Sequence, residues 1–308
     1  LKPVYTSQGV LKKRQGWLLK VEDHLGNCGW GEVAPLNHAE LTSCEKSLNE
    51  IKNSPFRDEL EEKLISKSGV LAFGIGAALA ELDCLIGGET KRDWLQAPQS
   101  SILLPNGSSL LSTLNVYLQN GRSQNKSLTL KWKVGIENPN VEKKLLEKIL
   151  EILPLNYHLR IDPNGGWDRD EAKDWADQLT GDSRLDWLEQ PLNANDLEGL
   201  FELSKKVPIA LDESLRYDPS LRNSWRNWQV RHPTLEGDPR ELLRELQSGK
   251  SFITISTSFE TGIGRRWVNH MAALQQTSAT PTAPGLAPGW CPTGALFSND
   301  PQIVWDAA

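Results

Sequence analysis

Short apolar segments that each end in a polar or charged residue recur along the second part of the chain. Between Asp162 and Ser256 the ends of successive segments lie 20 to 27 residues apart, which leaves room for one strand, one helix and two loops. A stretch with helical spacing follows each segment. The predicted strands are Ile102–Leu104, Leu128–Val134, Tyr157–Asp162, Asp186–Glu189, Ile209–Asp212, Gln229–His232 and Phe252–Ser256.

Strands that alternate with helices at this period predict a parallel sheet with right-handed crossovers. Seven or eight such units close into a barrel. An open, doubly wound α/β sheet is the competing arrangement, but no G-x-G-x-x-G motif follows any predicted strand. We therefore expect a (β/α)7β TIM-like barrel of the α/β class over residues 99–284.

The first part of the chain has a different pattern of apolar and polar residues. Two alternating stretches flank a glycine-containing turn at residues 24–27 and predict a β-hairpin, and two helical patterns follow. The predicted strands are Gly16–Val21 and Gly29–Val33, and the predicted helices are Ala39–Asn53 and Gly69–Leu85. We expect residues 1–98 to form an α+β capping domain, to which part of residues 285–308 returns.

Composition excludes several classes of partner. The net charge is -6, and lysines and arginines are spread along the chain, so we expect no nucleic acid partner. The longest apolar run, Val70–Ala80, is too short to cross a bilayer, so no membrane association is expected. The four scattered cysteines form no C-x-x-C pair, and no cationic leader opens the sequence, which favours a cytoplasmic protein. Oligomeric state is not indicated.

Three acidic residues end three successive predicted strands. The carboxyl ends of barrel strands face one pocket, so Asp162, Glu189 and Asp212 should meet there. A single Asp after a strand is more often a helix N-cap. Three carboxylates at the barrel period would repel one another unless a hard divalent cation lay between them. The pattern predicts a magnesium site.

A pair of lysines lies one strand earlier. In Lys131-Trp132-Lys133, strand alternation points both amines to one face and the indole to the other. Two close ammonium groups, with a metal ion nearby, are expected to lower each other's pKa. This predicts a neutral lysine that acts as a base near neutral pH.

Taken together, these motifs resemble the signature of the enolase superfamily. The superfamily uses a lysine or histidine base with magnesium. The matching motifs are Lys131-x-Lys133, Asp162-Pro163-Asn164, Glu189-Gln190-Pro191 and Asp212-Glu213-Ser214. Three further segments are similar to its o-succinylbenzoate synthase family, in the muconate-lactonizing-like branch: residues 29–35, 104–107 and 256–261.

The resemblance implies a specific reaction on a small carboxylate substrate. Asp162, Glu189 and Asp212 would bind Mg2+, for which Mn2+ could substitute. Lys133 would remove the proton α to the carboxylate and return it to the departing hydroxyl, with Lys131 tuning its charge. The product would be o-succinylbenzoate, made by a hydro-lyase reaction in menaquinone or phylloquinone synthesis. Expected substrate contacts are Ser256, Thr257, Asn106 and Gly107.

The sequence departs from the family at one site residue. His232 stands where relatives carry a second lysine opposite the first base. A racemase needs a base on each face of the carbanion, whereas a syn elimination can use one, so His232 favours dehydration and would supply positive charge. The alternatives are an N-succinylamino acid racemase or dipeptide epimerase, and a non-catalytic barrel that acts as a binding protein.

Overall fold

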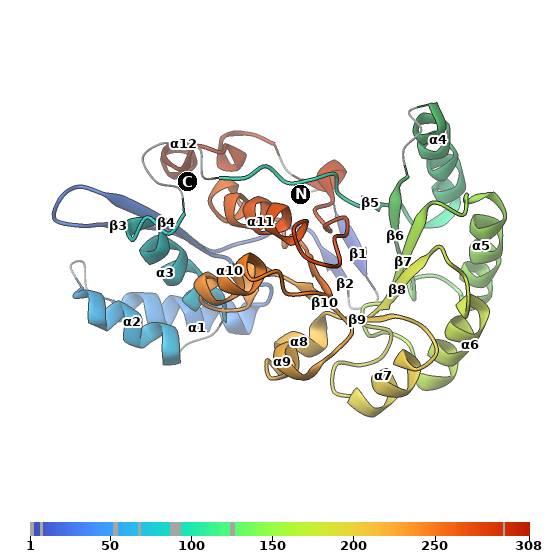
Figure 1. Ribbon diagram of the computed structural model, residues 1–308. Helices are drawn as coiled ribbons and strands as arrows, with labels where there is room; N and C mark the ends of the chain where they lie inside the picture. The colour runs from blue at the N-terminus through green and yellow to red at the C-terminus, as the bar shows by residue number, and fades with distance from the viewer. Residues whose placement is uncertain are drawn as a thin grey trace.

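Seven parallel strands form the central sheet of the computed structural model (Figure 1). The structure describes residues 3–6, 9–51, 55–66, 69–86, 94–123, 127–291 and 293–308. The strands lie side by side in chain order, and each predicted strand is confirmed to within one residue at either end. They are β5 Ile102–Leu103, β6 Thr129–Lys133, β7 His158–Asp162, β8 Leu185–Glu189, β9 Ile209–Leu211, β10 Trp228–Arg231 and β11 Ile253–Ile255.

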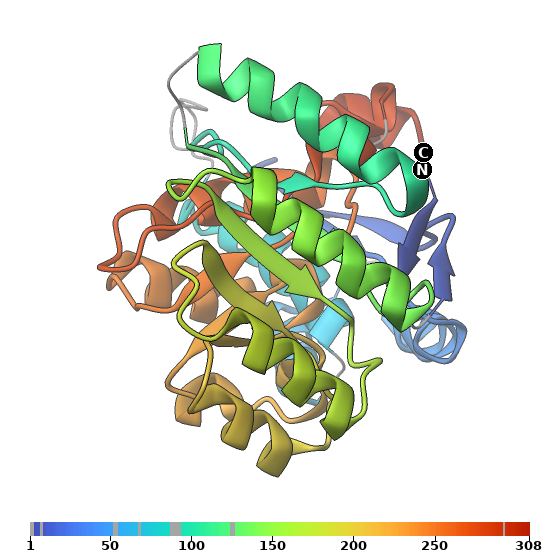
Figure 2. The same cartoon turned by 90° about the vertical axis from the view of Figure 1, so that its right-hand side faces the viewer.

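Helices follow the strands and cover the outer face of the sheet (Figure 2). Their apolar faces pack on the strands; in one of them, Leu242, Leu243 and Leu246 are buried. No helix in the described part of the chain is long and apolar enough to cross a bilayer. The helices are α4 Leu110–Ser123, α5 Pro139–Ile152, α6 Arg169–Leu179, α7 Leu197–Ser204, α8 Glu213–Tyr217, α9 Leu221–Ser224, α10 Pro239–Gln247 and α11 Gly262–Gln275.

A short extended stretch after α11 bridges the two edges of the sheet. On one side, Gly285 N donates to Ile255 O (2.8 Å) and Thr257 N donates to Gly285 O (3.0 Å). On the other side, Ser101 N donates to Pro284 O (2.9 Å). This stretch occupies the place of an eighth strand and confirms the (β/α)7β barrel over the open sheet. We propose that residues 284–286 belong to the barrel wall and that the tail after them belongs to the cap.

The cap contains the predicted hairpin and two predicted helices, together with elements that the sequence pattern missed. The hairpin strands pair antiparallel, as expected. The first predicted helix ends at Asn49, and its last predicted residues, 52–53, lie outside the described residues. The β1–β2 hairpin and α2 were not predicted. The cap elements are β1 Val4–Thr6, β2 Gly9–Leu11, β3 Trp17–Glu22, β4 Cys28–Val33, α1 His38–Asn49, α2 Arg57–Ser66 and α3 Gly69–Leu82.

Two glycines allow β4 to lie directly on α3. A Cβ atom at Gly29 would come within 1.9 Å of Ala78 O, and one at Gly31 within 1.9 Å of Gly74 O. Only glycine therefore permits this approach of strand and helix backbones. The packing accounts for the two glycines of the segment at residues 29–35, which lie in the cap and not in the pocket.

A buried carboxylate joins the cap to the barrel. Glu32 on β4 accepts hydrogen bonds from Thr261 Oγ1 (2.6 Å), Thr261 N (3.0 Å) and Gly264 N (3.1 Å) at the start of α11. Negative charge is favourable at a helix N-terminus. The C-terminal helix α12, Pro301–Asp306, also contacts the cap, because the ring of Trp305 lies 5.7 Å from that of Trp30. These contacts hold the cap over the open end of the barrel.

Candidate active site

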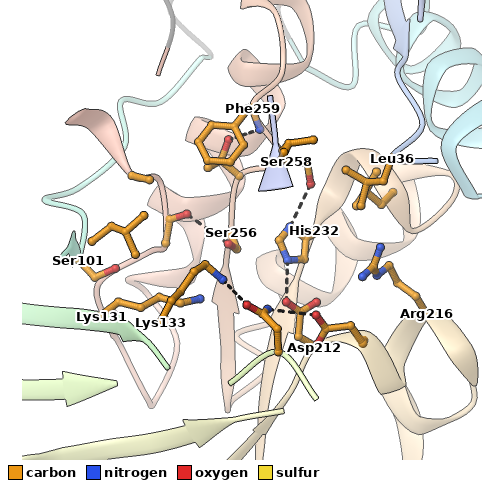
Figure 3. Close-up of a pocket in the computed structure, with 18 residues that line it drawn as sticks. Leu36, Ser101, Lys131, Lys133, Asp212, Arg216, His232, Ser256, Ser258 and Phe259 are labelled. Atoms are coloured by element: carbon orange, nitrogen blue, oxygen red, sulfur yellow. Dashed lines mark hydrogen bonds and ion pairs between the residues drawn. The ribbon is translucent and has the colours of Figure 1, made fainter. Parts of the chain in front are cut away.

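A cavity of about 180 Å3 lies at the carboxyl ends of the strands, beneath the cap (Figure 3). One part of it is lined by charged side chains. These come from β6 and from the segments that follow β9 and β10. Leu11 and Leu36 of the cap line another part. The cavity is therefore built from both parts of the chain, and the cap supplies apolar wall.

The two lysines of β6 point into this cavity, as strand alternation predicted. Lys133 Nζ lies 2.8 Å from Asp162 Oδ2. Lys131 Nζ lies 2.9 Å from Asp162 Oδ2 and 2.5 Å from Glu189 Oε1. Trp132 points to the opposite face and contacts Trp175 of α6. The strands thus bring both lysines and two of the three predicted metal ligands together.

Asp212 follows β9 and is positioned by the neighbouring strand. Gln190 Oε1 accepts hydrogen bonds from the backbone N–H of Asp212 (3.1 Å) and of Ser214 (3.0 Å). This contact gives the Glu-Gln-Pro motif a structural role. His232 Nε2 lies 3.3 Å from Asp212 Oδ2, and its Nδ1 lies 3.1 Å from Ser258 Oγ. His232 therefore faces the acids from the far side of the cavity, while Arg231 points outward to Glu236.

The protonation of these groups follows from their mutual contacts. Burial opposes ionisation of Asp162, but the ammonium groups of Lys131 and Lys133 outweigh it and hold the pKa of that carboxyl well below its usual value. Burial and the neighbouring Asp162 raise the pKa of Glu189. Burial acts against the charge of His232, yet the Asp212 carboxylate raises the pKa of the imidazole.

The expectation that the two lysines lower each other's pKa is wrong for Lys131 in this arrangement. Burial would lower the pKa of Lys131, but the carboxylates of Asp162 and Glu189 raise it well above its usual value. Two anionic neighbours at contact distance outweigh one cationic neighbour. Lys131 is therefore a protonated counter-ion to the acids.

Comparison with known proteins identifies the family of this site. Residues 120–224 match the family model described as enolase C-terminal domain-like, and residues 2–82 match the MenC N-terminal domain. The crystal structure of o-succinylbenzoate synthase from Thermosynechococcus elongatus BP-1, complexed with Mg in its active site, has a TM-score of 0.80 at 26% identity and covers 100% of this chain and 96% of that one. The chain is thus similar to enolase superfamily proteins in both its cap and its barrel.

Curated relatives within the superfamily agree with the finer resemblance seen in the motifs. The o-succinylbenzoate synthase of Thermosynechococcus vestitus is 29% identical over 286 residues, which cover 89% of this chain and 85% of the relative. That of Photorhabdus laumondii is 28% identical over 90% of this chain and 83% of the relative. The L-Ala-D/L-Glu epimerase of Bacillus subtilis, at 18% identity and a TM-score of 0.70 over 96% of this chain and 88% of its own, shows the shared fold alone. The resemblance to the o-succinylbenzoate synthase branch is confirmed.

The resemblance to the superfamily implies a divalent metal ion, and the residues present fit one. Asp162, Glu189 and Asp212 are at most 7% exposed and offer hard oxygen ligands. Among the described residues, Asp212 Oδ1 is buried without a hydrogen-bond partner, as is Glu213 Oε2 beside it. In the described part of the chain no three acidic, histidine or cysteine side chains lie close enough together to form a metal site, and lysine amines lie against two of the acids.

The predicted substrate contacts divide into two groups. Ser256 and Thr257 line the cavity. Asn106 instead lines a neighbouring cavity on the other side of Lys133, and Gly107 lies next to Glu137. The structure therefore brings only the first pair into the pocket that contains the acids.

Sequence reasoning gave no role to three residues that the structure brings into the cavity. Asn164 Oδ1 accepts a hydrogen bond from Lys133 Nζ (2.7 Å), and its Nδ2 donates to Glu213 Oε1 (3.1 Å). Burial and the Asp212 carboxylate raise the pKa of Glu213 to about 7. Asn164 and Glu213 belong to the Asp-Pro-Asn and Asp-Glu-Ser motifs, and this position could have indicated that they lie in the site. Arg216, one turn further along α8, lay outside them.

Proposed function

We propose that this protein is a magnesium-dependent o-succinylbenzoate synthase, a carbon–oxygen lyase that acts on 2-succinyl-6-hydroxy-2,4-cyclohexadiene-1-carboxylate. The observation that carries the proposal is the contact of Lys133 with Asp162 and Asn164 at the strand ends of a chain whose relatives are o-succinylbenzoate synthases. The pathway would be menaquinone or phylloquinone synthesis. The four free cysteines agree with the proposed cytoplasmic location.

Each pocket residue has a task in this elimination. Asp162, Glu189 and Asp212 would hold Mg2+, or Mn2+ in its place, and the ion would supply positive charge that stabilises the anion formed at the substrate carboxylate. Lys133 removes the α-proton and returns it to the departing hydroxyl. Lys131 remains beside it as a positive charge.

A direct assay tests the reaction and the cofactor together. Purified protein with Mg2+ should convert the hydroxy-cyclohexadiene carboxylate to o-succinylbenzoate, which is followed by the absorbance of the new aromatic ring. Chelation with EDTA should abolish turnover, and added Mg2+ should restore it. Exchange of the α-proton of N-succinylamino acids in deuterated water, without synthase activity, would assign the protein to the racemase alternative instead.

Replacing His232 with lysine should leave turnover within about threefold of the wild type, or raise it, because the position supplies positive charge and not a second base. His232 lies against Asp212 and Ser258, and a lysine ammonium can replace the charge next to Asp212. Steady-state kinetics of His232→Lys and His232→Gln measure this. A large loss in the lysine variant, equal to that in the glutamine variant, would show that the imidazole itself is required.

A further inference from the structure

The proposed substrate carries two carboxylates, and the metal-binding acids account for only one of them. A second carboxylate held at this cavity needs donors of its own, since taking an unpaired charge even partly out of water is costly. Much of the remaining wall is apolar and includes Leu11, Leu36, Leu103 and Phe259. The second carboxylate therefore needs a donor at this wall that the protein does not already use.

The polar groups that follow β11 are already engaged by the protein. Ser256 N donates to Arg231 O (2.9 Å), Thr257 N to Gly285 O (3.0 Å), and Ser258 N to Glu260 Oε1 (2.7 Å). The hydroxyl of Thr257 bonds Glu260 Oε2 (2.6 Å), and that of Ser256 bonds Gly285 O (3.2 Å). These donors would have to break existing bonds to bind a carboxylate.

The cationic side chains of the cavity differ in whether the protein already engages them. Lys131, Lys133 and His232 each contact a carboxylate of the protein. Arg216 has no hydrogen bond or ion pair to any residue that the structure describes, although it lines the cavity. In Figure 3 its side chain lies on the side of Leu36, across the site from the two lysines, with Asp212 and His232 between them. Among the described residues that line the cavity, Arg216 is the cation that no carboxylate of the protein engages.

We infer that Arg216 is a specificity-determining residue that binds the second, succinyl carboxylate of the substrate. The inference rests on the proposed function, which sets the first carboxylate at the acids. A guanidinium presents paired N–H donors that match a carboxylate in a bidentate contact. The side chain is exposed at the mouth of the cavity, so it meets the flexible end of a substrate whose ring lies deeper. Monocarboxylates of the same ring system lack this contact and bind more weakly.

Arg216→Met tests the inference through binding and turnover. We expect KM for the substrate to rise about 10- to 100-fold, the range for losing hydrogen bonds to a charged group, with kcat within about threefold. Calorimetry with o-succinylbenzoate should show a similar loss of affinity. Binding of 2-butanoylbenzoate, which lacks the terminal carboxylate, should be the same in both proteins. Arg216→Lys should fall between wild type and Arg216→Met.

A matched control variant isolates the effect of the Arg216 guanidinium. Arg226→Met removes an exposed arginine that does not line the cavity and should change neither KM nor ligand affinity. Equal weakening of both ligands in Arg216→Met, or unchanged KM, would overturn the inference; the former would mean that Arg216 acts on Asp212 and Glu213. A wild-type protein without synthase activity would instead refute the proposed function. An active wild type with an unaffected variant refutes the role of Arg216 alone.

Discussion

Replacing Lys133 with alanine is expected to lower kcat by about 1,000-fold or more, which is the range contributed by a positioned general base. The amine lies 2.8 Å from Asp162 and 2.7 Å from Asn164, and the cavity offers only Lys131 beside it on the same face among the described residues. Lys131 is held by two carboxylates and cannot take over the task. Steady-state assays with saturating Mg2+ measure the loss.

Magnesium binding should survive in Lys133→Ala, because the metal's ligands lie on other strands. Removing the ammonium also removes a group that competes with the ion for Asp162. Calorimetric titration with Mg2+ should therefore show unchanged or higher affinity. Lys143→Ala is the matched control, since this lysine pairs with Glu171 on the outer helices and should keep full turnover. Turnover that persists in Lys133→Ala would refute its role as the base.

Asp162→Asn is expected to abolish turnover and also the stabilisation that Mg2+ gives to the folded protein. A ligand that binds only the native state raises the melting temperature, so the wild type should show a clear Mg2+-dependent rise in Tm. The amide keeps the acceptor that bonds Asn164 N (2.9 Å) but lacks the charge that holds the metal and the two lysines. We expect a loss in kcat of at least about 1,000-fold.

The variant should also be less stable without metal, by about 3 kcal/mol, because it leaves buried ammonium groups short of a partner. Thermal melts with and without Mg2+ measure both effects. Asp186→Asn is the control: this acid pairs with Arg160 and His158 and does not line the cavity. That variant should lose some stability yet keep the response to Mg2+. A normal Mg2+-dependent rise in Tm for Asp162→Asn would exclude Asp162 as a metal ligand.

The sequence predicted the barrel strands closely because each is a short apolar run with a polar end. The eighth wall segment escaped prediction, since residues 284–286 lie among prolines and glycines and carry no apolar alternation. Their place follows from long-range hydrogen bonds to Ser101 and Ile255, which no local pattern encodes. The prediction that Asn106 contacts the substrate was less secure for a similar reason. Its place shortly after β5 was clear from the sequence, but the cavity that it lines was not.

The sequence alone determined the strand order, the face of the two lysines and the strand ends at which the three acids lie, because strand alternation and the barrel period depend only on local spacing. The tertiary structure decided which charges touch. Lys131 lies between Asp162 and Glu189, which reverses the expected direction of its pKa shift. The tertiary structure also brings Arg216 to the cavity without a hydrogen bond or ion pair to any described residue. Coulomb energies depend on distances between side chains of separate strands, and only the folded chain sets those distances.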